Sequence, residues 1–373
     1  MTEFSNRVER VSISGIREVF EAAGEDAINL GLGQPDFPTP EHARSAAVEA
    51  IQAGKTDAYT SNKGTESLRE AISAKFERDR GLAVDTEDII ATAGGSEALH
   101  LVMEAHVDQG DEVIYPDPGF VAYEALTHVA GGEPNPVPLR EDLTLDPATV
   151  EENITEDTAA FIVNSPGNPT GAVQSEEDMR EFARIAEEHD VLCVSDEVYE
   201  HIVFDGEHHS PMEFTDSGNV VVVSACSKTY SMTGWRLGWV VGSNERIERM
   251  LRVHQYVQAC ASAPAQYAAE GAIDGPQDVV DEMVATFEER RDLVVDGLTD
   301  MGLDVPEPKG AFYVMPKVPD GWVDEVLDRG VVVVPGEAFG DHGEGYARIS
   351  YATSTEELEE ALDVMREATK AVR

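Results

Sequence analysis

Five short runs rich in apolar and β-branched residues recur through the middle of the chain, and longer amphipathic segments separate them. The runs are Ile89–Thr92, Glu112–Tyr115, Ala160–Val163, Val191–Ser195 and Val220–Ser224. One of the segments between them, 176–188, carries its apolar residues at helical spacing, and Ser175 is placed to cap it. The alternation is typical of an α/β fold with a mainly parallel sheet covered by helices.

The character of the sequence changes after Gly275-Pro276. A long charged helix is expected from Asp278 to about Leu298, then two short apolar runs, GAFYVMPKV and VVVVPG, and a closing helix from Ser354. This order indicates a smaller α+β lobe, which the N-terminal segment is expected to join. A chain of 373 residues is long enough for two such lobes.

Small and polar residues follow directly after the first three strands, where ligands of open α/β sheets bind. The first strand runs into Gly94-Gly95-Ser96, whose amides and hydroxyl suit a phosphate, although a simple capped turn is the alternative. The second leads to Phe120, which could belong to the core or stack on a flat heterocycle. The third leads to NSPGNPTG, where two prolines restrict the backbone around Asn168.

The fourth and fifth strands end beside charged groups. Asp196 directly follows an apolar run, so we expect it to be partly buried and to need a proton or a cationic partner. Lys228 lies just past the fifth strand, where it is better placed as a desolvated amine nucleophile than as a surface charge. Glu197, Glu200 and His201 match no metal-binding spacing, so we predict a solvated helix face and no metal site.

Acidic residues greatly outnumber basic ones, with 73 Asp and Glu against 27 Lys and Arg and a net charge of −46. Such a surface repels nucleic-acid phosphate and anionic lipid, so neither nucleic acid nor membrane is an expected partner. A merely soluble acidic protein is one interpretation. We favour adaptation to molar salt, because the screening length falls to about 3 Å at that concentration.

No apolar leader and no stretch long enough to span a membrane occur in the sequence. Cys193, Cys226 and Cys260 lie far apart and form no CxxC pair, which favours reduced cysteines in the core. A cytoplasmic location is therefore expected.

The segment SKTYSMTGWRLGW, which contains Lys228, resembles the cofactor-lysine signature of class I/II pyridoxal-phosphate-dependent aminotransferases. Further blocks are similar to that family in its order: NLGLGQPDFPTPEH, NSPGNPTGAV, VSDEVYEH, KGAFYV and RISYATS. The similarity extends from about Ser12 to the last helix and is closest to the archaeal and bacterial aspartate/aromatic branch.

The resemblance implies the aspartate-aminotransferase-like fold type I of pyridoxal-phosphate enzymes. In that fold a large domain holds a mainly parallel seven-stranded sheet between helices, and a smaller α+β domain is added. The implied division is residues 1–44 in the small domain, 45–276 as the large cofactor-binding domain and 277–373 as the C-terminal small domain. Family members build the site across a homodimer.

The resemblance also implies roles for individual residues. Lys228 would hold pyridoxal 5'-phosphate as an imine and then move a proton at the substrate Cα. Asp196 would keep the pyridine nitrogen protonated. The other implied cofactor contacts are Tyr199 and Asn168 at the phenolic oxygen, Phe120 on the ring face, Gly95, Ser96 and Arg236 at the phosphate, and Tyr59 at the phosphate of the neighbouring subunit. Substrate would be bound by Gly33, Asn168 and Arg348, with Arg348 clamping its carboxylate through two parallel hydrogen bonds.

Several positions depart from the family pattern. Ala225 stands where many relatives have a phosphate-binding serine, so one phosphate contact is expected to be missing. Phe120 replaces a tryptophan, and Ser96 a lysine, that aspartate-specific members often carry. The stretch between Arg252 and Arg290 has no cation for a distal carboxylate, which argues against strict aspartate specificity.

The expected activity is transfer of the amino group of an L-amino acid, aspartate and/or aromatic, to a 2-oxo acid such as 2-oxoglutarate. Lys63 could read a distal carboxylate, but a loop-surface lysine is the favoured interpretation. A C–S β-lyase of the same fold and a non-catalytic sensor stay as alternatives. Arg348 favours transamination, and the acidic charge opposes a DNA-binding sensor.

Overall fold

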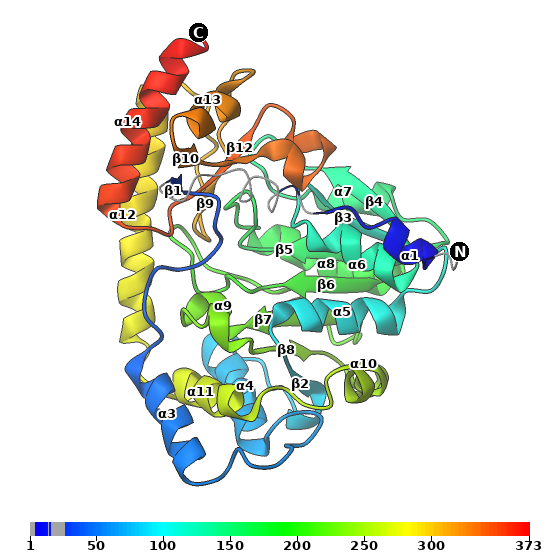
Figure 1. Ribbon diagram of the computed structural model, residues 1–373. Helices are drawn as coiled ribbons and strands as arrows, with labels where there is room; N and C mark the ends of the chain where they lie inside the picture. Colours follow the sequence, from blue (N-terminus) through cyan, green and yellow to red (C-terminus); the bar gives the residue numbers. More distant parts are fainter. Residues whose placement is uncertain (1–3, 14, 16–26) are drawn as a thin grey trace.

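A computed structural model describes residues 4–13, 15 and 27–373 (Figure 1). The rest of the predicted N-terminal segment, residues 1–3, 14 and 16–26, lies outside the described residues. Within the described part, the largest sheet has seven strands in the order β2-β8-β7-β6-β5-β3-β4. Neighbours are parallel except β8, which runs antiparallel to β2 and β7. The seven strands are β2 (Ile89–Thr92), β3 (Glu112–Asp117), β4 (Glu133–Pro138), β5 (Thr158–Asn164), β6 (Leu192–Asp196), β7 (Val220–Ala225) and β8 (Gly238–Val241).

Helices cover both faces of this sheet, which is why its central strands are apolar on both sides. Along β7, Val221 and Val223 pack on one face of the sheet, while Val220 and Val222 pack on the opposite face. The first helical layer covers the face of Val221 and Val223 and contains α5 (Gly95–His106), α6 (Ala122–Ala130) and α10 (Asn244–Val257). The second contains α4 (Glu66–Arg80), α7 (Pro147–Glu152), α8 (Glu176–Glu188) and α11 (Ala263–Asp274), with α3 (Glu41–Gln52) packed on α11. The expected α/β architecture is confirmed.

The observed ends of helices and strands agree with the predicted ones where the sequence carries a local signal, such as a capping residue. β2 and α8 have the predicted bounds, and the hydroxyl of Ser175 accepts a hydrogen bond from the Asp178 amide at 3.1 Å. β3, β5 and β7 are each longer than predicted, and β6 begins one residue later. The additional residues are held by inter-strand hydrogen bonds rather than by their own propensity.

The C-terminal part forms a second layer system beside the large sheet. The helices α12 (Asp278–Asp300) and α14 (Thr355–Ala371) lie side by side along one edge of the molecule (Figure 1). Buried Phe287, Trp322 and Tyr351 belong to the core beneath them. The other elements are α13 (Trp322–Asp328), an antiparallel sheet of β9 (Tyr313–Val314), β12 (Ala347–Ser350) and β11 (Val334–Pro335), and β1 (Ile28–Asn29) paired in parallel with β10 (Val331–Val332).

The N-terminal strand β1 therefore pairs with a strand of the C-terminal part. Helix α3 runs across residue 44 and packs on α11, and α12 begins two residues after position 276. The division at residues 44 and 276 stays a prediction. The chain also forms two short α-helices, α1 (Asn6–Glu9) and α9 (Cys226–Thr229).

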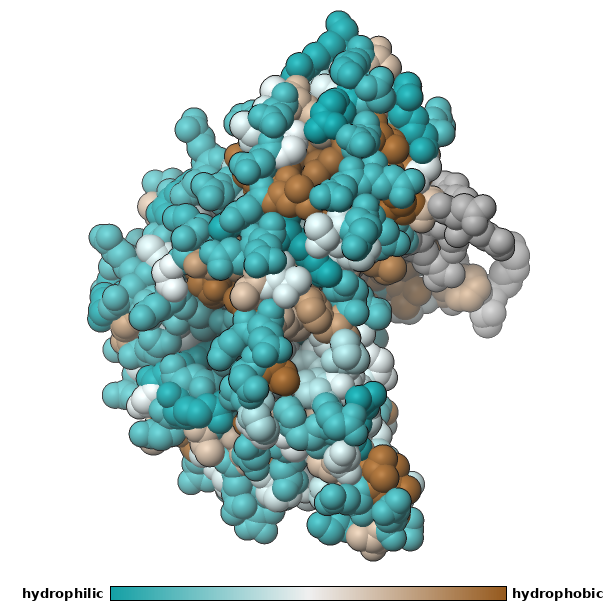
Figure 2. Space-filling model, turned by 90° about the vertical axis from the view of Figure 1, so that its left-hand side faces the viewer, coloured by the Kyte–Doolittle hydropathy of each residue, from teal (hydrophilic) through white to brown (hydrophobic). Residues whose placement is uncertain are grey.

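The surface agrees with the polar composition. The face in Figure 2 is mostly hydrophilic, and its apolar patches are small and separate. Cys193 and Cys226 are buried, Cys260 is half-buried, and all three are free. Among the described residues, no helix combines the length and apolar character needed to cross a membrane.

Candidate active site

A pocket opens at the carboxyl ends of the central strands. Asn164, Asp196 and Ala225 line it, and each is the last residue of its strand, β5, β6 and β7 respectively. Ten of the eleven predicted site residues line the same pocket: Gly33, Gly95, Ser96, Phe120, Asn168, Asp196, Tyr199, Lys228, Arg236 and Arg348. The sheet edge therefore brings together groups from both halves of the chain.

Lys228 lies on α9, the single helical turn that follows β7. Its Nζ donates a hydrogen bond to the carbonyl of Gly33 at 2.5 Å and lies 5.9 Å from the ring centroid of Tyr199. Burial, helped by the charges of Arg348 and Arg236, lowers the pKa of Lys228 to about 8. A much larger fraction of this amine is neutral near pH 7 than in an exposed lysine, so it is a competent nucleophile.

Asp196 ends β6 and has only 3% of its surface exposed. Its Oδ2 accepts a hydrogen bond from the hydroxyl of Tyr123 at 2.7 Å, and its Oδ1 accepts one from the Val198 amide at 3.4 Å. Burial raises the pKa of Asp196 to about 6, because it outweighs these hydrogen bonds and the charge of Lys228. A cationic group facing this carboxyl would stabilise its ionised form.

Arg348 is fixed on all sides and has 2% of its surface exposed. Its guanidinium donates to Asn168 Oδ1 at 2.9 Å and to the Gly31 carbonyl at 2.5 Å. The same group lies 4.6 Å from the ring centroids of both Tyr313 and Phe339. Burial lowers the pKa of Arg348, and its Nε has no hydrogen-bond partner among the described residues. A buried donor without a partner favours an incoming anion.

Tyr199 and Tyr313 both line the pocket, and their hydroxyl groups are hydrogen-bonded, with the oxygens 3.0 Å apart. Burial raises the pKa of both phenols, so both stay protonated at neutral pH. The Tyr313 hydroxyl also lies 2.1 Å from the place where a Cβ at Gly33 would stand. A Cβ at this position would clash with the Tyr313 hydroxyl, so the close approach of the chain to the pocket requires glycine here.

The start of α5 forms an anion-binding end of the pocket. Gly94 caps this helix at a φ of +84°, and Gly95 and Ser96 begin its first turn. A Cβ at Gly94 would lie 2.7 Å from an Arg236 guanidinium nitrogen, so the turn is packed directly against that cation. Free amides of a twelve-residue helix beside an arginine suit a phosphate group.

Phe120 and Tyr59 have different settings. Phe120 is half-buried at the pocket, and its ring meets that of Tyr123 edge to face at 5.7 Å. Tyr59 does not line the pocket, and 90% of its surface is exposed. Its predicted contact is with a second copy of the chain, so it stays a prediction.

Two expectations about charged residues are wrong. Glu197 and Glu200 do not form a solvated face, because both are buried against the Arg80 guanidinium. Lys63 is not a surface lysine, because only 7% of its surface is exposed and its Nζ donates to the Glu87 carbonyl at 2.8 Å. The partner is Arg80 for the two glutamates and Glu87 for Lys63. Each partner lies on another element, so no local pattern in the sequence indicates the contact.

Two residues of the site were not predicted from the sequence. Tyr123 donates to Asp196, and Tyr313 contacts both Tyr199 and Arg348. Tyr313 lies in the KGAFYV block and could have been suspected from it. Tyr123 follows Phe120 by three residues, the spacing that places two side chains on one helix face.

Comparison with known proteins agrees with this geometry. Residues 25–365 match the family described as aminotransferase class I and II. The probable aspartate aminotransferase of Methanocaldococcus jannaschii is 44% identical over 97% of this chain and 99% of its own length. Aromatic-amino-acid aminotransferase 2 of Thermococcus litoralis is 40% identical over 98% of each chain.

A solved structure of aspartate aminotransferase from Thermus thermophilus with maleate superimposes with a TM-score of 0.94 at 38% identity, covering 99% of this chain and all of the other. The seven-stranded sheet thus has the aspartate-aminotransferase architecture. The matched region includes the pocket and every predicted site residue. The chain belongs to the aminotransferase class I and II family.

Proposed function

We propose that this aminotransferase depends on pyridoxal 5'-phosphate and moves the amino group of an aspartate or aromatic L-amino acid to a 2-oxo acid such as 2-oxoglutarate. The observation that carries the proposal is the placing of a half-buried lysine, Lys228, whose amine has a lowered pKa, and a buried carboxyl, Asp196, in one pocket. When bound, the cofactor supplies an electron sink that stabilises negative charge at the substrate Cα.

The residues of the pocket fit this cofactor at four points. Asp196, whose pKa burial raises, would gain a stabilising partner in a cationic ring nitrogen. The first turn of α5, with Ser96 and Arg236, would hold the phosphate. Tyr199 and Asn168 would donate hydrogen bonds to the phenolic oxygen, which suits a phenol that stays protonated. Phe120 would cover one face of the ring.

Lys228 would hold the cofactor covalently and, once substrate replaces it, take up and return the proton at the substrate Cα. A pKa of about 8 suits both tasks near neutral pH, because the amine can accept a proton and also release it. The nearby Gly33 carbonyl, 2.5 Å from Nζ, restricts where that amine can point.

Arg348 would bind the α-carboxylate of the substrate. Its two contacts to Asn168 and Gly31 and its two aromatic neighbours fix the plane of the guanidinium before substrate arrives. A fixed plane favours paired hydrogen bonds to a carboxylate and reduces the entropy lost on binding.

The choice of amino donor follows from the remaining lining. Among the described residues, the cations that line the pocket are Lys228, Arg236 and Arg348, and each already has a proposed role. Leu32 and Leu99 offer apolar contacts to an aromatic side chain. The relatives named above include both aspartate and aromatic enzymes, which supports a dual preference.

A panel of amino donors tested with 2-oxoglutarate in high salt examines this proposal. We expect glutamate to form with aromatic donors and with aspartate, and no product without a 2-oxo acid. Release of pyruvate and ammonia from cysteine conjugates without any 2-oxo acceptor would instead indicate a β-lyase.

The proposal includes a homodimer in the cytoplasm, adapted to high salt. Exposed Tyr59 and Tyr256 lie on adjacent segments, which Asn62 ties together by donating to the Ala259 carbonyl at 2.5 Å. Exposed aromatic residues on two segments joined in this way support the proposed contact surface. Three free cysteines support a reducing compartment, and the net charge of −46 supports a saline one.

A further inference from the structure

The end of β6 and the turn that follows it present their side chains to two different environments. Asp196 and Tyr199 face the pocket, whereas Glu197 and Glu200 face away from it and are buried, Glu197 completely. The turn itself is closed by a hydrogen bond from the Glu200 amide to the Glu197 carbonyl at 3.0 Å. Glu197 directly follows Asp196, and Glu200 directly follows Tyr199, so the position of each buried glutamate affects that of its neighbour in the pocket.

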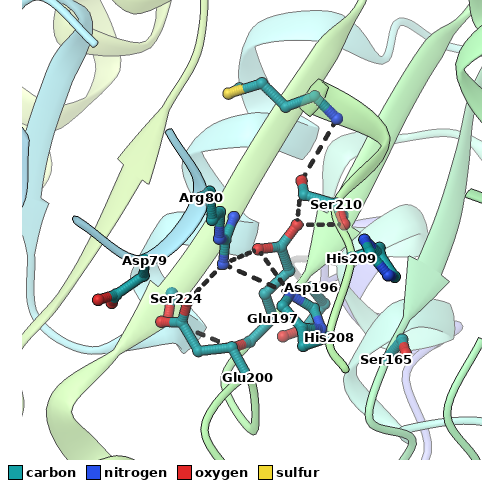
Figure 3. A network of polar contacts seen from close by, with 12 residues as sticks. Asp79, Arg80, Ser165, Asp196, Glu197, Glu200, His208, His209, Ser210 and Ser224 are labelled. Carbon is teal, nitrogen blue, oxygen red and sulfur yellow. Dashed lines mark hydrogen bonds and ion pairs between the residues drawn. The ribbon is translucent and has the colours of Figure 1, made fainter. Parts of the chain in front are cut away.

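The carboxylate of Glu197 is held by four side chains (Figure 3). Its Oε1 accepts hydrogen bonds from the hydroxyls of Ser195 at 2.7 Å and Ser210 at 2.6 Å. Its Oε2 lies 2.5 Å from a guanidinium nitrogen of Arg80 and 3.3 Å from Nε2 of His208. Both oxygens therefore have two partners, and the side chain has no freedom to turn.

Glu200 is held from the same side. Its Oε1 accepts from the Ser224 hydroxyl at 2.9 Å, and its Oε2 pairs with Lys75 at 3.1 Å and with the same Arg80 nitrogen that contacts Glu197. Lys75 pairs in turn with Asp79 at 2.9 Å. Arg80 is the last residue of α4, so one guanidinium bridges two carboxylates of the turn to a helix distant in sequence.

The clamp formed by Arg80 with Glu197 and Glu200 joins charged groups. Burial acts to raise the pKa of Glu197, but the charge of Arg80 and the hydrogen bond of His208 outweigh it and leave the pKa lowered. The pKa of Glu200 is lowered in the same way by Lys75 and Arg80, so both carboxylates stay ionised. Glu197, Glu200 and His208 are close enough together to resemble metal ligands, yet the Arg80 guanidinium already contacts both carboxylates and supplies the positive charge.

We propose that Arg80 is a positioning residue that fixes Asp196 and Tyr199 in the pocket through Glu197 and Glu200. The inference rests on the proposed function, because it assigns the turn the task of holding the two groups that would face the cofactor ring. On the pocket side, Asp196 has one side-chain hydrogen-bond donor among the described residues, Tyr123. The Val198 amide also donates to Asp196, and pairing in the sheet holds its backbone. The ion pairs of Arg80 behind the turn add a further constraint.

Substitution of Arg80 itself is a poor test, because it leaves two buried carboxylates without a cation and destabilises the fold. Glu197→Gln keeps the size and the acceptor for the two serines but turns a neutral amide toward Arg80. We expect kcat to fall by about tenfold to hundredfold, the cost of a small misplacement of reacting groups, while KM for the amino donor changes little because Arg348 is untouched. The pH midpoint of the visible absorbance of bound pyridoxal phosphate is expected to shift.

Thr369→Val is the matched control. It removes a buried hydrogen bond, from Trp322 Nε1 to the Thr369 hydroxyl at 2.8 Å, in the C-terminal core. We expect it to lower the melting temperature without moving kcat or the absorbance midpoint. A Glu197→Gln protein that melts earlier but keeps the kcat and midpoint of the unsubstituted protein would overturn the positioning role. Absence of any cofactor absorbance in the unsubstituted protein would overturn the proposed function instead.

Discussion

The hydroxyl of Tyr123 donates a 2.7 Å hydrogen bond to Oδ2 of Asp196, and both side chains are buried. Tyr123 comes from α6 on one helical layer, whereas Asp196 ends a central strand. The bond lowers the pKa of a carboxyl that burial otherwise raises. Tyr123 therefore helps to keep Asp196 ionised, which is the form that can hold a cationic ring nitrogen.

Tyr123→Phe is expected to weaken cofactor binding. Loss of a hydrogen bond to a buried carboxylate costs about 1.5 kcal/mol, so the Kd for pyridoxal phosphate should rise roughly tenfold. Because the pKa of Asp196 rises without this donor, activity should also be lost at a higher pH as the solution is acidified. Titration of the cofactor by fluorescence and a pH–rate profile measure the two effects. An unchanged Kd together with an unchanged acid limb would contradict the role of Tyr123.

Arg348→Lys is expected to weaken amino-acid binding far more than cofactor binding. A lysine cannot form two parallel hydrogen bonds or fill the space between Tyr313 and Phe339. A loss of about 2 kcal/mol corresponds to a roughly thirtyfold rise in KM for the donor. Arg236→Lys, at the phosphate end, should show the opposite pattern. Equal losses of substrate and cofactor in Arg348→Lys would count against its carboxylate role.

The lowered pKa of Lys228 predicts a distinctive pH dependence of labelling in protein freed of cofactor. The neutral amine is the nucleophile, so acylation becomes faster as pH rises through the pKa. Half of the maximal rate is expected near pH 8 for Lys228, where burial lowers the pKa to about 8. Lys317, whose pKa its hydrogen bond to Asp304 raises, is the internal control and should react only at higher pH. Mass spectrometry of the two peptides makes the comparison, and coinciding midpoints would contradict the burial effect.

Low salt is expected to destabilise the protein. At about 0.01 M salt the screening length is roughly 30 Å, so most of the acidic groups behind the net charge of −46 repel one another. The melting temperature should therefore rise steadily as potassium chloride is added up to the molar range. A melting profile and activity that are the same at low and high ionic strength would rule out salt adaptation.

Strand ends and helix starts made part of the site predictable from the sequence, and the family resemblance supplied the rest. Asp196 ends one apolar strand and Lys228 comes three residues after the end of the next, so the parallel sheet brings both to one edge. Gly95 and Ser96 open a helix for the same topological reason. These assignments needed only local patterns and the rule that ligands bind at the carboxyl ends of strands.

Contacts between distant elements were not predictable in this way. Glu197 and Glu200 were predicted to lie on a solvated helix face, but both are buried against Arg80, which belongs to α4. Lys63 can be buried because its ammonium group forms ion pairs with Glu87 and Glu248, which belong to two other segments. Charge pairs of this kind leave no periodicity, so only the folded chain reveals them.

The central claim is that Lys228 holds the cofactor covalently while facing Asp196. Reduction of the cofactor-loaded protein with borohydride, followed by peptide mapping, tests it most directly. We expect the reduced cofactor on the peptide that contains Lys228, and we expect Lys228→Ala to fold, to take up no reducible label and to lack turnover. A label on any other lysine, or normal transamination by Lys228→Ala, would contradict the claim.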